Sequence, residues 1–199
     1  MKLVFKHALA AIVLMLSFGA PVVAGPLEDS VAAYNRGDYM TSLQIRRPLA
    51  YQGDPVAQNY LGIMYERGHG VPQDYAEALN WYRKAADQGN AAAEFNLGGM
   101  YQNGKGVTEN YVEAVRWYRR AADQGLAGGQ LLIGTMYEIG MVVPKDVVRA
   151  YMWLNLSAAQ GDQVAAKERD KVAGLMTPAQ IAEAQKLARE WEPTKQLPR

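Results

Sequence analysis

The sequence contains no cysteine and only two histidines, His7 and His69, among its 199 residues. The absence of cysteine excludes disulfide bonds, thiolate metal sites, cysteine nucleophiles and a lipidated N-terminal cysteine. The sequence also lacks a phosphate-binding glycine loop and a histidine pair at zinc-binding spacing. It has no Ser-x-x-Lys motif, because Ser30, Ser42 and Ser157 are not followed by a lysine three residues later. We therefore expect no metal, no cofactor and no enzymatic activity.

Excess charge of either sign is missing too, with 21 lysine and arginine residues against 20 aspartate and glutamate residues. A surface that binds nucleic acid or anionic lipid usually carries an excess of positive charge. Because the two signs are interspersed along this chain, the composition does not indicate nucleic acid as a partner.

Long hydrophobic runs are restricted to the N-terminus. Two lysines precede an almost wholly apolar stretch at residues 8–18. Residues 22–24 are small residues of the type that a signal peptidase recognises. An uncleaved membrane anchor is the alternative, but a spanning helix needs roughly 20 apolar residues. We predict a signal peptide over residues 1–24 with cleavage before Gly25, a periplasmic or secreted protein, and no stable membrane insertion after cleavage.

The rest of the chain is organised by an internal repeat of 36 residues. The interval separates Gly53, Gly89, Gly125 and Gly161, and the neighbours of these glycines agree in the same register. Three further positions recur in the best-preserved units, namely Trp81, Trp117 and Trp153, then Tyr65, Tyr101 and Tyr137, then Gly62, Gly98 and Gly134. So many agreements in one register indicate a true repeat.

Each unit has the pattern of two helices joined by a turn. In the first complete unit, Leu61 and Tyr65 lie on one helical stripe, and the glycines and proline over residues 68–72 predict the turn that follows. Asp74 can cap a second helix, with Glu77 three residues later as its capping-box partner. Because two helices of about a dozen residues cannot bury their apolar faces alone, the pairs are expected to stack.

The recurring aromatic residues could form a ladder that stacks sugars or binds peptides, but core packing is the better interpretation. They follow the repeat period and lie on the helix face opposite the polar residues. A glycine such as Gly62 in a helix interior costs about 1 kcal/mol relative to alanine. This cost is understandable if the glycine lets a tryptophan or tyrosine of the second helix approach closely.

Two segments of the chain resemble Sel1-like repeats, which are relatives of the tetratricopeptide repeat. Their sequences are YLGIMYERGHGVPQDYAEALNWYRKAADQG and NLGGMYQNGKGVTENYVEAVRWYRRAADQG. The resemblance implies an all-α fold, an α-solenoid of antiparallel helix pairs wound into a right-handed superhelix. It covers three units, at residues 54–89, 90–125 and 126–161. Residues 25–53 look like a degenerate first repeat of the same type.

The C-terminal part loses the repeat register, as expected for an end that caps a solenoid and faces water. Residues 177–180 have the order of an N-cap, a first-turn proline and a capping-box partner, which predicts a final helix to about Trp191. We expect capping helices over residues 162–192 and a flexible tail over residues 193–199.

Candidate binding residues are expected where the units differ from one another. In tetratricopeptide-like stacks the first helices line the concave surface, so first-helix side chains one step off the core stripe would form a groove across the units. These side chains are Tyr60, Ile63 and Arg67, then Asn96, Gly99 and Asn103, then Leu132, Thr135 and Ile139. The alternative is that they are neutral surface positions.

The Sel1-like resemblance implies a non-enzymatic scaffold or adaptor of the cell envelope, which would bind a partner protein or peptide in the concave groove. One alternative is a cell-wall-related ligand-binding protein or a β-lactamase-like hydrolase, because some cysteine-rich relatives have been associated with penicillins. The other is a regulator of a membrane sensor, which the sequence does not distinguish from a scaffold.

Overall fold

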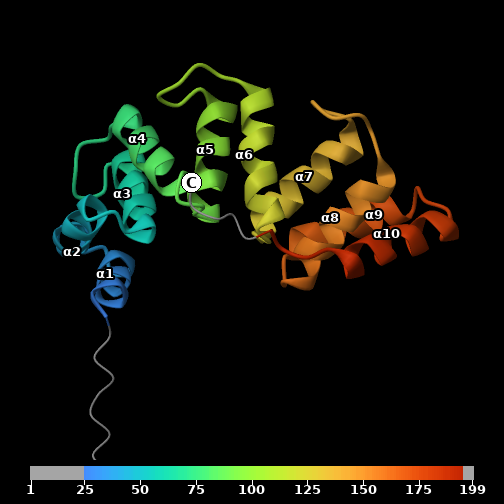
Figure 1. The fold of residues 1–199 in the computed structure, drawn as a ribbon, viewed down its shortest axis with the longest axis horizontal. Coiled ribbons are helices and arrows are strands. Elements are labelled where there is room, and N and C mark those ends of the chain that lie inside the picture. Colours follow the sequence, from blue (N-terminus) through green and yellow to red (C-terminus); the bar gives the residue numbers. More distant parts are fainter. Residues whose placement is uncertain (1–24, 195–199) are drawn as a thin grey trace, which may run out of the picture.

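The computed structural model describes residues 25–194, which form ten α-helices and no β-strand (Figure 1). The predicted signal peptide, residues 1–24, and residues 195–199 of the predicted tail lie outside the described residues. The helices are α1 (Pro26–Asn35), α2 (Tyr39–Tyr51), α3 (Pro55–Arg67), α4 (Tyr75–Ala86), α5 (Ala91–Asn103), α6 (Tyr111–Asp123), α7 (Ala127–Ile139), α8 (Val147–Ala159), α9 (Gln163–Ala173) and α10 (Pro178–Glu190). None of the helices in residues 25–194 is long and apolar enough to cross a membrane.

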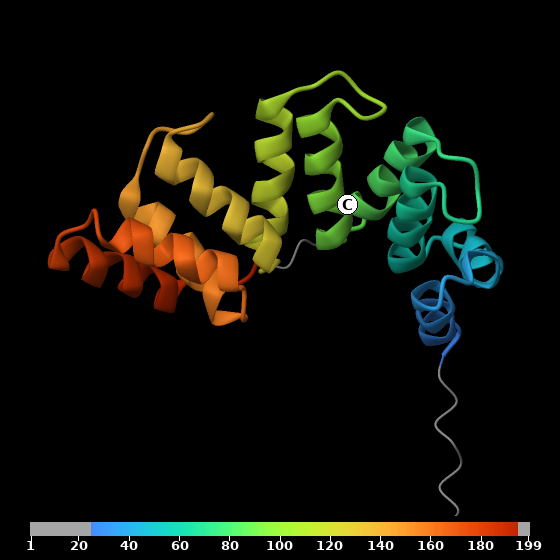
Figure 2. The same cartoon turned by 180° about the vertical axis from the view of Figure 1, so that it is seen from behind.

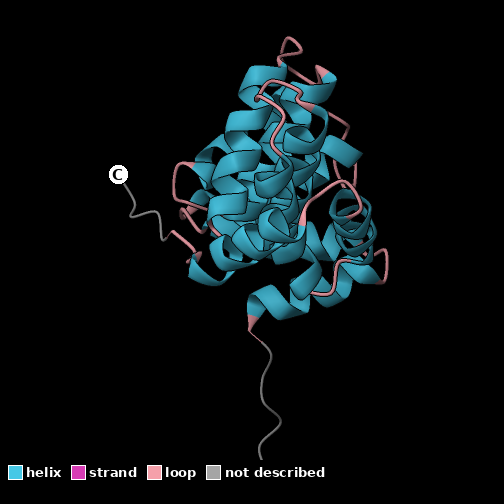
Figure 3. Ribbon diagram, turned by 90° about the vertical axis from the view of Figure 1, so that its right-hand side faces the viewer, coloured by secondary structure: helices cyan, strands magenta, loops and turns pink. Residues whose placement is uncertain are grey.

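The helices pack in sequence order along a curved path. Each pair, α3 with α4, α5 with α6 and α7 with α8, forms a hairpin, and consecutive hairpins meet through α4 with α5 and α6 with α7. The two opposite views show the chain rising from α1 to the central hairpin and descending to α10 (Figures 1 and 2). Seen along its length, the molecule is a stack of helices with short connecting loops (Figure 3). This arrangement confirms the predicted α-solenoid of helix pairs.

Side-chain caps begin the helices where the sequence predicts them, but the capping box expected at the start of α4 does not form. Asp74 accepts hydrogen bonds from the backbone of Ala76 and Glu77 at the start of α4. The Asp74 backbone N–H, which Glu77 was expected to bind, instead donates to the carbonyl of the recurrent Tyr65 at 2.9 Å. The turn between the two helices therefore satisfies this donor, and the glutamate is left facing solvent. The predicted capping box of α10 is present.

The recurrent first-helix glycines admit a bulky side chain from the second helix of the same pair. A Cβ atom at Gly62 would lie 2.6 Å from the ring of Tyr82, and one at Gly98 would lie 2.5 Å from the ring of Tyr118. The sequence pattern predicts tryptophan or tyrosine at this contact. It is made by the residue after the tryptophan, so each glycine allows two helices to approach around a buried tyrosine.

The recurring tryptophans lie mainly inside the stack. Trp81 and Trp153 are buried, whereas Trp117 is half-buried against the core between α4 and α5. The indole Nε1 atoms of Trp81 and Trp117 are buried without a hydrogen-bond partner among the described residues. Burial of the rings supports core packing over a ladder of exposed aromatic side chains.

The C-terminal helices close the solenoid and return the chain to its middle. Trp191, just after α10, packs edge-on against Trp153 with 6.0 Å between ring centroids. Thr194 donates hydrogen bonds from its backbone and its hydroxyl to the carbonyl of Asp123, at 2.8 and 3.0 Å. The described beginning of the predicted tail is therefore attached to the end of α6.

Candidate protein-binding groove

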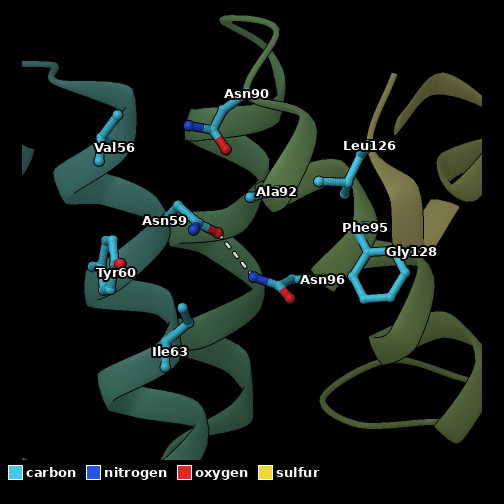
Figure 4. Close-up of a pocket in the computed structure, with 10 residues that line it drawn as sticks. All are labelled: Val56, Asn59, Tyr60, Ile63, Asn90, Ala92, Phe95, Asn96, Leu126 and Gly128. Atoms are coloured by element: carbon cyan, nitrogen blue, oxygen red, sulfur yellow. Dashed lines mark hydrogen bonds between the residues drawn. The ribbon is translucent and has the colours of Figure 1, made fainter. Parts of the chain in front are cut away.

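A groove with a volume of about 500 Å³ lies between first helices of consecutive pairs. In the close-up, side chains of α3 form one wall, residues of α5 and the beginning of α7 form the other, and Asn59 and Asn96 lie between them (Figure 4). The lining residues are Val56, Asn59, Tyr60, Ile63, Asn90, Ala92, Phe95, Asn96, Leu126 and Gly128. None of them is charged, so the groove presents apolar surface and neutral amides.

Three of the nine residues predicted from the sequence, Tyr60, Ile63 and Asn96, line this groove. The other six lie outside it. Ile139 is 57% exposed at the end of α7, and Leu132 packs partly against the core of the C-terminal half. The remaining four are Arg67, Gly99, Asn103 and Thr135, of which Asn103 donates to the carbonyl of Gly99 and Thr135 to that of Leu131. The nine residues thus do not form one cavity, and their role in binding stays a prediction.

Several residues that line the groove were not among the predicted candidates, because they lie on a different stripe of the first helices. Val56, Ala92 and Gly128 occupy the same repeat position and differ between units, which is the signal used for the other candidates. Their shrinking side chains leave space in the groove. A Cβ atom on Gly128 would lie 3.1 Å from the Phe95 ring, so glycine there makes room for the phenylalanine.

The two asparagines in the groove present a hydrogen-bond donor and an acceptor. Asn96 Nδ2 donates to Asn59 Oδ1 at 2.9 Å. This bond leaves Asn59 Nδ2 and Asn96 Oδ1 without a protein partner among the described residues. A side-chain amide can donate two hydrogen bonds and accept two. The pair can therefore offer one N–H and one C=O to a ligand, which are the complements of a backbone peptide group.

A buried row of polar side chains fixes the first helices behind the groove. Gln58 lies next to Asn59 in α3, accepts a hydrogen bond from Gln88 at 2.8 Å and donates to the carbonyl of Ala50 at 3.1 Å. The same arrangement recurs two hairpins further on the C-terminal side, where Gln130 accepts from Gln160 at 2.8 Å. Each glutamine ties a first helix both to its own second helix and to the preceding hairpin.

The middle hairpin has a glutamate in this row in place of the glutamine. Glu94 is fully buried, and it accepts hydrogen bonds from Gln124 at 2.7 Å and from Arg120 at 2.8 Å. A carboxylate cannot donate to the carbonyl of Ala86, and Arg120 makes that contact at 3.4 Å instead. Burial raises the pKa of Glu94, and the charge of Arg120 opposes the rise. The pair Glu94 and Arg120 therefore replaces one buried glutamine.

The stacked helix pairs and their 36-residue period place the chain among the tetratricopeptide-like α-solenoid proteins. A family model described as Sel1 repeat matches three segments, residues 55–90, 91–126 and 127–162, which together make up more than half of the chain. The chain belongs to the Sel1 repeat family. Proteins of this family generally serve as scaffolds for protein–protein interaction, and family members are typically not catalytic.

Solved structures similar to this chain include two Sel1-type proteins. A Sel1 repeat protein from Oxalobacter formigenes shares 35% sequence identity over 72% of this chain, with a TM-score of 0.67. The second is c5321, described as a protective antigen present in uropathogenic Escherichia coli strains displaying an SLR fold. It shares 26% identity over 81% of this chain, with a TM-score of 0.57. The matched region spans 59% and 45% of those two chains. No curated protein matched significantly.

Proposed function

We propose that this protein is an exported scaffold whose groove between α3, α5 and α7 holds an extended segment of a partner protein. The observation that carries the proposal is the pair Asn59 and Asn96, which leaves one amide donor and one amide acceptor free between two apolar walls. An extended peptide exposes backbone N–H and C=O groups along its length and projects its side chains to alternating sides. Apolar walls and a central amide pair fit both features.

The uncharged lining defines the kind of segment expected. Tyr60, Ile63 and Phe95 provide aromatic and aliphatic surface without a basic or acidic side chain in the groove. Burying a charged side chain there would carry a desolvation cost without a partner to offset it. The central part of the bound segment should therefore be apolar or neutral.

A site-specific photocrosslinking experiment tests the proposed groove. Benzoylphenylalanine placed at Ile63 should crosslink a partner in cells. The same residue at Val164 serves as the matched control, because Val164 is an apolar β-branched residue like Ile63 but lies exposed on α9, outside the groove. Equal crosslinking of one partner from both positions, or none from Ile63, would contradict the groove as the binding site.

Export is the part of the proposal that rests on the N-terminal sequence pattern at residues 1–24. The full-length chain expressed in a Gram-negative host should be recovered from the periplasmic fraction with Gly25 as its first residue. Mass determination of the purified protein checks the cleavage site. Recovery of the uncleaved chain from the cytosol would refute export.

A further inference from the structure

The side chain of Arg46 in α2 is fully buried, and most of its hydrogen-bonding capacity is unused. Its Nε atom donates to the hydroxyl of Ser42 at 3.3 Å. Both terminal nitrogens are buried without a hydrogen-bond partner, and no carboxylate among residues 25–194 forms an ion pair with it. Burial lowers the pKa of the guanidinium, whereas Tyr60 and the charge of Asp54 oppose this shift without an ion pair to Arg46. Arginine remains protonated in proteins. The structure therefore holds a buried positive charge without a partnered anion.

The repeat shows that arginine is the exception at this position. Tyr82 and Tyr118 occupy it in the next two units, and their hydroxyls donate to Glu66 at 2.8 Å and to Gln102 at 2.7 Å on the first helix of the same pair. In the degenerate first unit the turn between α1 and α2 has three residues, whereas the turn between α3 and α4 has seven, so no residue of α1 corresponds to Glu66 at the 36-residue interval. The buried polar residue of α1 is Ser30.

Ser30 does not receive the arginine, since its hydroxyl donates to the carbonyl of Leu27 at 2.6 Å. The substitution of arginine for tyrosine thus removes a satisfied hydroxyl from the fold and adds a charged group that the fold does not satisfy. Leaving an ionised group buried and unpaired is costly. A partner from outside the chain is the simplest way to recover that cost.

The guanidinium lies behind a residue of the groove. Its central carbon is 3.5 Å from the centroid of the Tyr60 ring, and Tyr60 lines the groove wall on α3. Movement of this one half-buried ring would connect the two unpartnered nitrogens with the groove. Tyr60 therefore covers the charge in the unliganded protein, with a cation–π contact in place of an anion.

Aromatic side chains gather next to Tyr60 on the side of α1 and α2. The ring of Tyr34 from α1 is 6.4 Å from that of Tyr60, and its hydroxyl is hydrogen-bonded to Nδ1 of His69 at 2.8 Å. Tyr39 stacks on the His69 ring at 3.9 Å. None of these three side chains lines the groove, whose lining begins at α3 and extends to the start of α7. Arg46 therefore lies behind one end of the lining, next to Tyr60, where the end of a bound segment would lie.

We infer that Arg46 receives the C-terminal carboxylate of the segment bound in the groove, once the Tyr60 ring has moved aside. The two terminal nitrogens can hold a carboxylate through two parallel hydrogen bonds, the geometry that arginine favours for this group. The inference rests on the proposed peptide-binding function, and it adds direction to it. The segment ends at α3, with its preceding residues running past Asn59 and Asn96 towards α7.

Peptide binding to the full chain tests this inference. Two matched libraries of seven-residue synthetic peptides are compared, one with free C-terminal carboxylates and one with C-terminal amides. The free-acid library should bind at least about tenfold more tightly, as expected for a charge-assisted pair shielded from water. The NMR signals of the Arg46 side chain should shift with free-acid peptides only. This measurement uses the unaltered protein.

Arg46→Met tests the residue, and Arg116→Met controls for the loss of one positive charge. Arg116 is an exposed residue of α6, paired with Glu113 on its own helix. Arg46→Met should reduce the preference for free acids to about one, keep amide binding, and leave the melting temperature unchanged or raised, because an apolar side chain replaces an unpaired buried charge. Arg116→Met should keep the preference.

The outcomes separate the inference from the function on which it rests. Equal binding of both libraries to the unaltered protein would overturn the role of Arg46 and leave the groove standing. Preference for internal aspartate or glutamate in amidated peptides would overturn the assignment to the chain terminus. Failure of every peptide to bind would overturn the peptide-binding function itself.

Discussion

Replacing Glu94 by glutamine should flatten the dependence of stability on pH. Burial raises the pKa of this carboxyl above its ordinary value of 4.5. Between that value and the raised one, the folded protein holds more protons than the unfolded chain, so stability falls as pH increases through this window. Glu94→Gln removes the titrating group, and the part of the slope that it causes should disappear.

The glutamine should also fit the site, because two neighbouring hairpins already show the geometry. Gln58 and Gln130 accept from a glutamine of their own hairpin and donate to the preceding hairpin, at 3.1 and 3.5 Å respectively. At neutral pH we expect Glu94→Gln to leave stability unchanged or to add about 1 kcal/mol, since a neutral hydrogen-bonded amide replaces a buried charge. One kcal/mol corresponds to about 2–4 °C in melting temperature for a chain of this size.

Removing the arginine alone should have the opposite effect. The third hairpin has Leu156 where the second has Arg120, so leucine fits this position when glutamine stands opposite. Arg120→Leu beside Glu94 leaves the buried carboxylate without its cation, and we expect a loss of about 3 kcal/mol, the lower end for a broken buried pair, because Arg120 is 38% exposed.

Urea unfolding followed by circular dichroism between pH 4 and 7 measures these effects, with the double variant completing a mutant cycle. The double variant should be close to Glu94→Gln alone. An unchanged pH slope in Glu94→Gln, or additive losses in the double variant, would refute the argument that the pair substitutes for a buried glutamine.

Three other substitutions test the packing of the repeat by thermal unfolding. Val142 has a φ of 65°, a left-handed conformation that is unfavourable for a β-branched residue, whereas the other units have glycine there. Val142→Gly should raise the free energy of unfolding by about 1 kcal/mol. A lower melting temperature would show that the valine side chain contributes more than the strain costs. Gly98→Ala should destabilise by about 1–3 kcal/mol, because the added methyl group would lie 2.5 Å from the Tyr118 ring; a neutral effect would mean that the ring moves freely. Trp153→Ala should cost about 3–5 kcal/mol, and an unchanged melting temperature would be incompatible with its burial.

The helices and their stacking could be predicted because they follow from local patterns that the repeat presents several times. Asp74 caps the helix expected of it, and Gly68 follows α3 as its C-cap in the left-handed conformation that glycine tolerates. The glutamate half of the capping box could not be predicted correctly. Its failure depends on a bond between the cap and the carbonyl of Tyr65, which belongs to the preceding helix.

The groove was predicted only in part because it depends on how consecutive hairpins turn relative to one another. A repeat period shows which side chains are equivalent, but it does not show whether equivalent side chains of three units share one cavity. Tyr60 and Asn96 do so, whereas Leu132 packs towards the core. The buried charge of Arg46 was also missed, because a lone arginine in a degenerate unit carries no signal until its surroundings are known.

Some residues that depart from the repeat are compensated by other residues of the fold, and others are not. We interpret a compensated departure as structural and an uncompensated one as functional. Glu94 in place of glutamine is matched by Arg120, which supplies the missing donor to Ala86, so all of its altered bonds are made within the chain. Arg46 in place of tyrosine has no such match, because Ser30 is engaged elsewhere and both terminal nitrogens stay unpartnered. A fold optimised for stability alone would favour tyrosine or leucine at that position, as the other units have. The uncompensated exception also lies against Tyr60 in the wall of the groove, where an outside group could satisfy it once that ring has moved.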